Sequence, residues 1–345
     1  MERDVLVARF QQALLKATTQ VVTCRSQALP ALQEAAALLW FTDPTRALLS
    51  SSEMEANTGR PLEDWLEEEL RGEFSGLLRA GSYPTSTLSE MSFELGIHDD
   101  QEKVQAIILQ AQNRCRLLPQ GNLIYEGFRR YIIGHAIEVA GAASDILIPL
   151  SLALSDLFDP IPAHLIRNGL IYPCPVCQWP MKVNSTNVCC DSSWCTERAG
   201  KYTMRGRKLI RTANAEPVEG HRAGSSVMLK PAIWKFTLVP GLLELSLYRR
   251  LNDLGLTVEL WPEFDKADVR VTIGEHTLDL DAKVWHSPNR LLTHLKSLPA
   301  AYPHWIVIPD YQRKSVNYLD IETPSHIRVF TESQCIKEIS RRCGH

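Results

Sequence analysis

The sequence predicts a multidomain protein with an α-helical N-terminal region, a small cysteine-rich module and a C-terminal α/β domain built on a mixed sheet. Three observations carry this prediction. Apolar residues recur at helical spacing up to about residue 165, cysteines cluster in the segment that follows, and helix and strand patterns alternate from Trp234 onward. We expect domains at 1–165, 166–212 and 233–345, with a linker or extended connection rich in Gly, Pro and Ser at 213–232.

Length and composition are those of an ordinary folded protein. The chain has 345 residues, of which 45% are hydrophobic and 22% charged, enough for two or three domains with separate cores. A net charge of −3 excludes a global field that attracts nucleic acid, so any surface for a polyanion must be a local patch. No apolar run is long enough to span a bilayer, and the first residues are not a secretory signal. We therefore expect a cytoplasmic protein with no membrane partner.

The N-terminal region carries helical periodicity but no chemical motif. A large helical segment of this kind favours a docking role, either for a protein partner or for DNA. Residues 87–108 also show a short helix, Gly96 and a second helix, which is the pattern of a helix-turn-helix DNA reader. Such helix pairs are more often plain parts of a bundle, so both interpretations stay open.

The cysteines indicate a metal site. Five of the nine lie between Cys174 and Cys195, in CPVC and CCDSSWC. Two cysteine pairs about a dozen residues apart supply the four soft ligands that Zn²⁺ binds as a tetrahedron in zinc ribbons. Cys189 would point to the opposite side of the strand from Cys190, and the choice between these two neighbours is left open. We expect a structural zinc ion on Cys174, Cys177, Cys190 and Cys195, with buried free thiols or a redox pair as the alternative.

A basic strip follows the cysteines in KYTMRGRKLIRT. Basic side chains interleaved with an aromatic residue are typical of a surface that contacts phosphates, although a solvated basic strand would give the same pattern. The candidate nucleic-acid-binding residues are Lys201, Arg205, Arg207, Lys208 and Arg211.

The C-terminal region predicts one helix, a β-meander and then helix–strand repeats. The first helix has its apolar stripe between residues 243 and 254. The following elements are expected as strands near 257–261, 268–273 and 277–285, a helix near 288–297, strands at 304–309 and 326–330, and a closing helix at 333–342.

The meander predicts its own register. Gly274–Glu275 suits a two-residue hairpin turn with glycine first. Counting back from that turn places Arg270 opposite Asp279 and Asp268 opposite Asp281, while apolar residues meet apolar residues on the other face.

Two carboxylates that face each other across a sheet repel, so this pairing suggests that a cation lies between them. Hard oxygen ligands favour Mg²⁺ or Mn²⁺. Lys283 shares the face of Asp281, where a lysine can orient water and stabilise charge on phosphorus during an in-line displacement. The alternative is a surface ion pair between Asp281 and Lys283 on a structural strand.

Asp268, a hairpin and then Asp281-Ala282-Lys283 resemble the signature of the PD-(D/E)xK nuclease superfamily, which has the restriction-endonuclease-like fold. The resemblance covers about residues 234 to 345. It implies that Asp268 and Asp281 bind the metal and that Lys283 is the catalytic lysine. It also implies that Glu244, on the preceding helix, is an outer metal or water ligand.

The chain departs from that signature at its first position. Pro262 precedes Asp268 by six residues rather than one, so the first acidic residue is not part of a literal Pro-Asp pair. Asp265 therefore competes with Asp268 for the place of the first metal ligand.

The order of helical region, zinc ribbon and nuclease-like domain is also similar to the restriction-endonuclease-like partner proteins encoded with prokaryotic Piwi-type (pPIWI-RE) defence genes. The two resemblances imply a Mg²⁺-dependent endonuclease that hydrolyses DNA to leave a 5′ phosphate. Cleavage of both strands would favour a homodimer with two active sites. One alternative is a catalytically silent nucleic-acid-binding adaptor that docks a helicase or a guide-binding partner. A second is a DNA-binding regulator built on residues 87–108.

Overall fold

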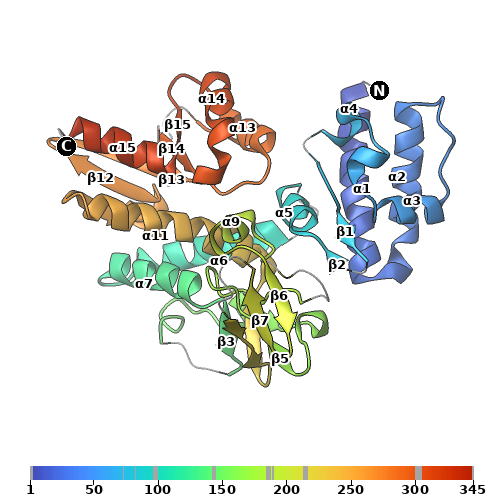
Figure 1. Cartoon of the computed structure of the whole chain (residues 1–345). Coiled ribbons are helices and arrows are strands. Elements are labelled where there is room, and N and C mark those ends of the chain that lie inside the picture. The colour runs from blue at the N-terminus through green and yellow to red at the C-terminus, as the bar shows by residue number, and fades with distance from the viewer. Residues whose placement is uncertain are drawn as a thin grey trace. The chain divides into compact units, whose positions relative to one another are not determined.

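The computed structural model divides the chain into two compact units, Met1–Asp99 and Asp100–His345. Figure 1 shows their helices and strands. The structure describes residues 3–72, 74–81, 83–95, 100–141, 145–183, 188, 190–212, 217–299 and 305–343.

The first unit is a helical bundle around α1. Its buried core brings residues of α1 such as Phe10 and Leu14 together with residues of α2 and with Leu88 of α5. The helix α3 begins with a capping box, in which the hydroxyl of Ser50 accepts the backbone N–H of Glu53 and the Glu53 side chain accepts the N–H of Ser50. The elements are α1 (Arg3–Thr23), η1 (Arg25–Gln27), α2 (Leu29–Thr42), α3 (Ser51–Asn57), η2 (Leu62–Asp64), α4 (Glu68–Arg71), β1 (Arg79–Ala80), β2 (Tyr83–Pro84) and α5 (Ser86–Glu94).

The second unit begins with two helices that pack onto the C-terminal half of the chain. The helix α7 contacts α11 and α12, and α6 contacts α10. Residues 87–108 therefore divide between the two units, with α5 in one and α6 in the other, and Gly96 lies outside the described residues. The elements up to the cysteine-rich segment are α6 (Asp100–Cys115), α7 (Gly121–Gly134), β3 (Ile137–Val139), α8 (Leu154–Leu157), β4 (Phe158–Pro160), η3 (Ala163–Leu165) and β5 (Leu170–Ile171).

The cysteine-rich segment and the stretch after it form small sheets. The strand β7 pairs with β6 on one side and β8 on the other, and β10 lies between β3 and β4. The stretch expected as a linker or extended connection thus supplies paired strands. These elements are α9 (Ser193–Ala199), β6 (Tyr202–Arg205), β7 (Lys208–Arg211), β8 (Pro217–Glu219), β9 (His221–Arg222), β10 (Ser226–Leu229), α10 (Pro231–Ile233) and the π-helix η4 (Trp234–Leu238).

The C-terminal part is a five-stranded mixed sheet in the order β11-β12-β13-β14-β15. The first three strands form an antiparallel meander, and β14 and β15 continue the sheet in parallel with β13. The elements are α11 (Val239–Asn252), β11 (Thr257–Leu260), α12 (Pro262–Asp265), β12 (Val269–Ile273), β13 (His276–Ala282), α13 (Pro288–Ser297), β14 (Trp305–Ile308), η5 (Asp310–Gln312), α14 (Arg313–Glu322), β15 (Arg328–Thr331) and α15 (Glu332–Arg342).

Helices cover both faces of this sheet, which explains why all four residues of β14 are buried. Ile306 and Ile308 share one core with leucines of α13 and with Val316 and Leu319 of α14. On the other face the Trp305 ring packs against Phe330, at 4.4 Å between ring centroids, and lies under the guanidinium of Arg342 from α15. The helix α15 also contacts α11.

The hairpin register expected from the sequence is confirmed from the turn to the pair Val269–Leu280, and Asp268 lies one residue before β12 begins. Ile273 pairs with His276, Arg270 with Asp279 and Val269 with Leu280, and Gly274 has a positive φ of 60° that suits the turn. The helix α14 was not expected, since residues 310–322 lie where we expected only a connection between strands. Among the described residues, no helix is long and apolar enough to cross a membrane.

Candidate metal centre and acidic site

The four cysteines expected from the spacing lie together. Each is buried, and the sulfur atoms of Cys174, Cys177, Cys190 and Cys195 all lie within 4.8 Å of one another. A knuckle positions the first pair, because the N–H of Cys174 bonds to the carbonyl of Trp179 and Gln178 takes a left-handed conformation with a φ of 60°. Cys189, the neighbour that competed with Cys190, lies outside the described residues.

The pKa shifts of these thiols indicate that a bound cation would stabilise the cluster. The neighbouring thiols donate hydrogen bonds to Cys174 and lower its pKa. The pKa of the Cys190 thiol is raised by burial and then by its neighbours, and that of Cys195 is raised chiefly by its contact with Cys174. Four sulfur donors can all ionise together only around a bound metal, and a compact set of four thiolates is the donor set that Zn²⁺ prefers.

The cysteine module packs against the C-terminal sheet domain. Trp179 stacks on Trp234 at 5.0 Å between ring centroids. The carboxylate of Glu332, which is buried at the start of α15, accepts Arg198 from α9 at 3.2 Å and Ser246 from α11 at 2.6 Å. Arg250 adds a third contact to the same carboxylate at 3.1 Å. These contacts were not foreseen, because the partners lie far apart in the sequence.

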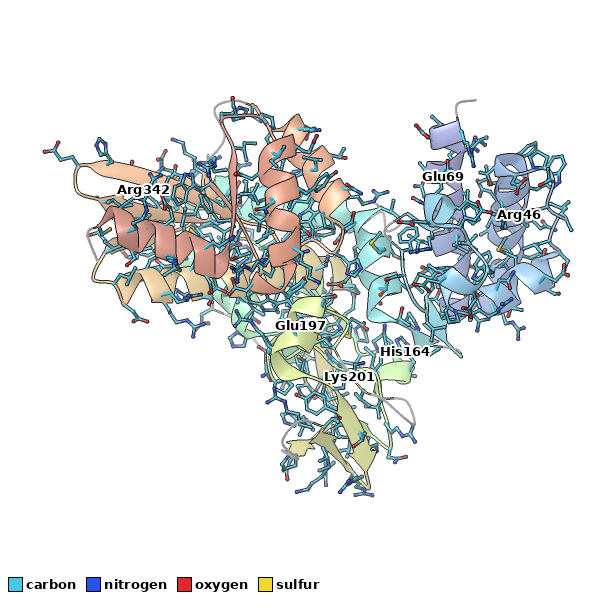
Figure 2. The ribbon with its side chains drawn as sticks, turned by 45° about the horizontal axis from the view of Figure 1, so that its top comes forward. Arg46, Glu69, His164, Glu197, Lys201 and Arg342 are labelled. Atoms are coloured by element: carbon cyan, nitrogen blue, oxygen red, sulfur yellow. The ribbon has the colours of Figure 1, made fainter. Side chains whose placement is uncertain are left out.

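The expected basic strip divides between two faces of its hairpin. Tyr202 pairs with Arg211 and Arg205 with Lys208, so that Arg211 and Arg205 fall on opposite faces. Lys208 forms an ion pair with Glu219 at 2.6 Å. Lys201, which is labelled in Figure 2, is exposed, as are Arg205 and Arg207.

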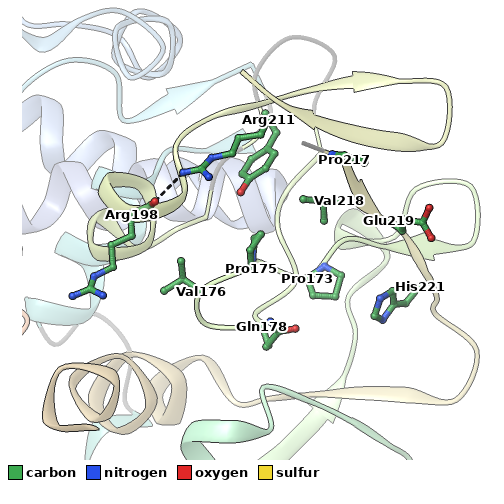
Figure 3. Close-up of a pocket in the computed structure, with 11 residues that line it drawn as sticks. Pro173, Pro175, Val176, Gln178, Arg198, Arg211, Pro217, Val218, Glu219 and His221 are labelled. Carbon is green, nitrogen blue, oxygen red and sulfur yellow. Dashed lines mark hydrogen bonds between the residues drawn. The ribbon is translucent and has the colours of Figure 1, made fainter. Parts of the chain in front are cut away.

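A cavity of about 420 Å³ lies on the same module (Figure 3). Pro173, Pro175 and Pro217 form part of its wall, together with Arg211, whose Nη2 donates to the carbonyl of Arg198 at 2.9 Å. None of the acidic residues expected to bind a metal lines this cavity. It is therefore separate from the site described next.

The acidic site lies at the start of β12 and at the end of β13. The Oδ2 atom of Asp268 accepts the backbone N–H of Ala282 at 2.7 Å, which fixes its carboxyl group beside Asp281. The two carboxyl groups share a hydrogen bond, and Nζ of Lys283 lies 2.6 Å from Oδ2 of Asp281. Asp281 is only 3% exposed. The structure thus brings the acidic pair and the lysine together on one face.

The pKa of Asp268 is raised well above its ordinary value. Burial is the first cause, the negative charges of Asp281 and Glu244 add to it, and Lys283 opposes it. Burial and the neighbouring carboxylates thus favour the protonated form of Asp268 over the charged form, and a bound cation would oppose that preference. The pair therefore fits a hard divalent ion such as Mg²⁺ or Mn²⁺.

Glu244 is buried, with 2% exposure, on the inner side of α11. Its Oε2 atom accepts Nη2 of Arg129 at 2.8 Å and Nε1 of Trp261 at 2.5 Å. Burial raises the pKa of Glu244, and Arg129 opposes that rise. The same guanidinium also binds Asp265, which accepts the hydroxyl of Tyr125 at 2.7 Å.

The segment before Asp268 has a strained backbone. Trp261, Glu263, Phe264 and Asp265 have φ values of 47°, 53°, 62° and 74°. Left-handed conformations cost about 1–3 kcal/mol each outside glycine and persist where the surroundings hold them. The contact of Trp261 with Glu244 and that of Asp265 with Arg129 do so here. Because Asp265 is held by Arg129 and Asp268 meets Asp281, the geometry favours Asp268 as the first metal ligand.

Comparison with known proteins found one family that matches the C-terminal part of the chain. Residues 241–345 match the family described as REase associating with pPIWI_RE. The expected resemblance to the partner proteins of pPIWI-RE systems is thereby confirmed for the C-terminal region. The match includes Glu244 and the whole acidic pair with Lys283, but it begins after α7, which carries Arg129. No curated protein and no solved structure matches the chain.

Sequence reasoning missed Arg129 and Tyr125. Both lie on α7, in the pattern IYEGFRRYIIG, where an arginine within an apolar helix face was the available signal. An arginine that a helix buries is almost always paired with an acid, and Glu244 was already a candidate.

Proposed function

We propose that this chain is a metal-dependent nuclease with a restriction-endonuclease-like C-terminal domain that hydrolyses phosphodiester bonds of DNA in a prokaryotic defence system. One observation carries the proposal: Asp268, Asp281 and Lys283 lie together at the start of β12 and the end of β13, inside the region that matches the family. The family's description supports an association with a pPIWI protein, and we propose that the helical part of the chain docks that partner.

In this proposal Asp268 and Asp281 hold the catalytic ion, which supplies Lewis acidity toward a phosphoryl oxygen. The ammonium group of Lys283, fixed by Asp281, orients the attacking water and stabilises the charge that develops on the phosphate. The water oxygen forms a bond to phosphorus, the bond to the 3′ oxygen breaks, and the products are a 5′ phosphate and a 3′ hydroxyl. The four cysteines hold a structural zinc ion.

The first prediction tests the nuclease itself. With Mg²⁺ or Mn²⁺ the purified protein should cleave one or more of linear duplex, circular and single-stranded DNA or RNA, tested with and without its protein partner. Lys283→Ala should lose about 10²–10³-fold in rate, since it removes a preorganised cation from the reacting group. The control Lys296→Ala, which loses only a surface contact to Glu322, should match the wild type.

Silence of the wild type on every substrate and with every partner would contradict the proposal. It would favour the adaptor, in which the same sheet is a scaffold and the chain binds nucleic acid without cutting it.

The second prediction concerns the proposed nucleic-acid surface of the zinc ribbon. Lys201, Arg205 and Arg207 are exposed, so each can release a counterion on binding duplex DNA. Changing all three to alanine should lower the slope of log K against log salt by about 2–3, at roughly 0.9 for each lost phosphate contact. The slope is measured by fluorescence anisotropy between low and moderate salt.

The matched control is Lys296→Ala with Glu322→Ala. It removes an exposed ion pair of 3.6 Å on α13 and α14, outside the proposed surface, and leaves the net charge unchanged, so the slope should stay as in the wild type. An unchanged slope in the triple variant would show that the strip does not contact phosphates.

A further inference from the structure

Arg129 joins the helical part of the second unit to the acidic site. It comes from α7, outside the matched family region, yet it is only 5% exposed. Its two terminal nitrogens bind Glu244 and Asp265, and its guanidinium lies 5.0 Å from the centroid of the Trp261 ring. A guanidinium is permanently charged and planar, so it links two carboxylates in a fixed geometry.

The charges around it form one connected group. Glu244, Asp265, Asp268 and Asp281 are the carboxylates, and Arg129 and Lys283 are the cations. The charges of Asp281, Glu244 and Lys283 all shift the pKa of Asp268, so these four groups influence one another. Four carboxylates against two cations leave two negative charges, which one divalent ion balances.

The contacts of Glu244 determine its role toward that ion. Its Oε2 atom accepts hydrogen bonds from both Arg129 and Trp261, at 2.8 and 2.5 Å. In contrast, Asp281 makes its ion pair with Lys283, a side chain that the proposed reaction itself requires. Among the described residues, the four cysteines are the one group of three or more metal-ligating side chains whose donor atoms lie within 4.8 Å of one another. The acidic residues therefore provide two metal ligands, Asp268 and Asp281, while its hydrogen bonds keep Glu244 away from the ion.

Resting on the nuclease function proposed above, we propose that Arg129 is a positioning residue that occupies the place of a second cation. It keeps Glu244 and Asp265 out of the inner coordination sphere, so that the acidic site binds a single divalent ion on Asp268 and Asp281.

Stability alone gives a poor account of this arginine. Replacing a buried ion pair or triad by apolar residues of similar size is often neutral or stabilising, because desolvation of the charges offsets their attraction. Part of α7 is already apolar and packs against η4 and α11, so apolar residues could replace Arg129 together with its two carboxylates. A methionine in place of Arg129 alone would instead leave both carboxylates buried without their counter-charge, which is destabilising. What methionine cannot supply is the positive charge between two carboxylates.

The test counts metal ions and does not depend on cleavage. The zinc-loaded full chain is titrated with Mn²⁺, and bound and free Mn²⁺ are measured by electron paramagnetic resonance. The wild type should bind one Mn²⁺. Asp281→Asn removes a direct ligand and should weaken that binding by more than the about 10–100-fold that loss of an outer partner costs. Arg129→Met, which frees the carboxylates of Glu244 and Asp265 to act as ligands, should bind a second Mn²⁺.

The matched control is the double variant Arg129→Met with Glu244→Gln. It removes one of the two freed carboxylates, so Asp265 remains alone and the stoichiometry should return to one. A purely structural role for Arg129 would not produce this restoration. Folding of each variant is checked by its urea unfolding curve before the titration.

Glu244→Gln alone covers the case in which Arg129→Met fails to fold. Held away from the ion, Glu244 should affect Mn²⁺ affinity by less than about 10-fold, the lower end of what outer partners contribute. Two ions on the wild type, one ion on a folded Arg129→Met, or a loss in Glu244→Gln equal to that in Asp281→Asn would each overturn the proposal.

The outcomes for Arg129 and for the nuclease can be told apart. One bound Mn²⁺ with no cleavage would remove the nuclease function and leave the role of Arg129 intact. Cleavage with two bound ions would do the reverse. Absence of any Mn²⁺ binding would remove the metal site and the role of Arg129 together.

Discussion

Cys190→Ser is expected to release the zinc ion and unfold the ribbon. The four sulfur atoms are buried within 4.8 Å of one another, in a module whose sheets are only two or three strands wide. Such a module has too small a core to fold alone, and zinc binding supplies about 10 kcal/mol or more of the folding free energy in small zinc domains. Zinc content per chain, measured by atomic absorption, should fall from one to near zero.

The structural loss can be followed through tryptophan. Trp194 is 2% exposed and Trp179 is 4% exposed, and Trp179 stacks on Trp234. Unfolding of the ribbon should expose both side chains, shift the fluorescence to longer wavelength and remove much of the near-ultraviolet circular dichroism. The helical signal in the far ultraviolet should largely remain, because the long helices lie outside the ribbon.

Cys335→Ser is the matched control. Cys335 is also fully buried, but it lies on α15, away from the cysteine cluster. Placing a hydroxyl there should cost only about 1–3 kcal/mol and leave the zinc content unchanged. Equal behaviour of the two variants, or a Cys190→Ser protein that keeps its zinc, would contradict the proposed metal centre.

Local sequence patterns were sufficient where the contacts are local. The turn at Gly274 and the alternation on either side of it set the pairing of β12 with β13, because a slip of one residue would bury the charged face. The spacing of the cysteines likewise predicted that two pairs lie together, although it left the choice between Cys189 and Cys190 open. In both cases the partners are close in sequence, so periodicity and turn chemistry decide the geometry.

Local sequence patterns could not predict contacts between residues that lie far apart in the chain. The position of Glu244 on an amphipathic helix is compatible with exposure to solvent. Glu244 is buried because it forms an ion pair with Arg129, which lies 115 residues earlier in the chain. Asp265 meets Arg129 across 136 residues. The helix α14 was missed because its apolar positions, Val316 and Leu319, are few and become significant only when packed against β14.

Asp268→Asn is expected to make the protein more stable while abolishing cleavage. The Asp268 carboxyl group is buried beside the charges of Asp281 and Glu244, and these raise its pKa above the ordinary 3.8. An asparagine keeps the acceptor for the N–H of Ala282 and can donate to Asp281, but it carries no charge. At neutral pH, without added divalent ions, the free energy of unfolding should rise by about 1 kcal/mol, as at other sites where function costs stability.

The pH dependence of this gain follows from the direction of the shift. Between 3.8 and the raised pKa, the folded wild type holds a proton on Asp268 that the unfolded chain has lost, so its stability falls as the pH rises through this window. The asparagine variant has no such loss. Its advantage should be near zero below pH 3.8, grow through the window and level off above the folded pKa.

Urea unfolding of both proteins across this pH range provides the measurement, and Asp279→Asn in the same hairpin is the control. Asp279 accepts Arg270 at 2.6 and 2.9 Å, so its loss should destabilise the protein by up to about 1 kcal/mol at neutral pH. Added Mg²⁺ should raise the melting temperature of the wild type and leave Asp268→Asn unchanged, because the ion replaces the proton between the two carboxylates. A destabilised Asp268→Asn, or a gain that does not vary with pH, would mean that Asp268 and Asp281 do not repel and that no cation is needed between them.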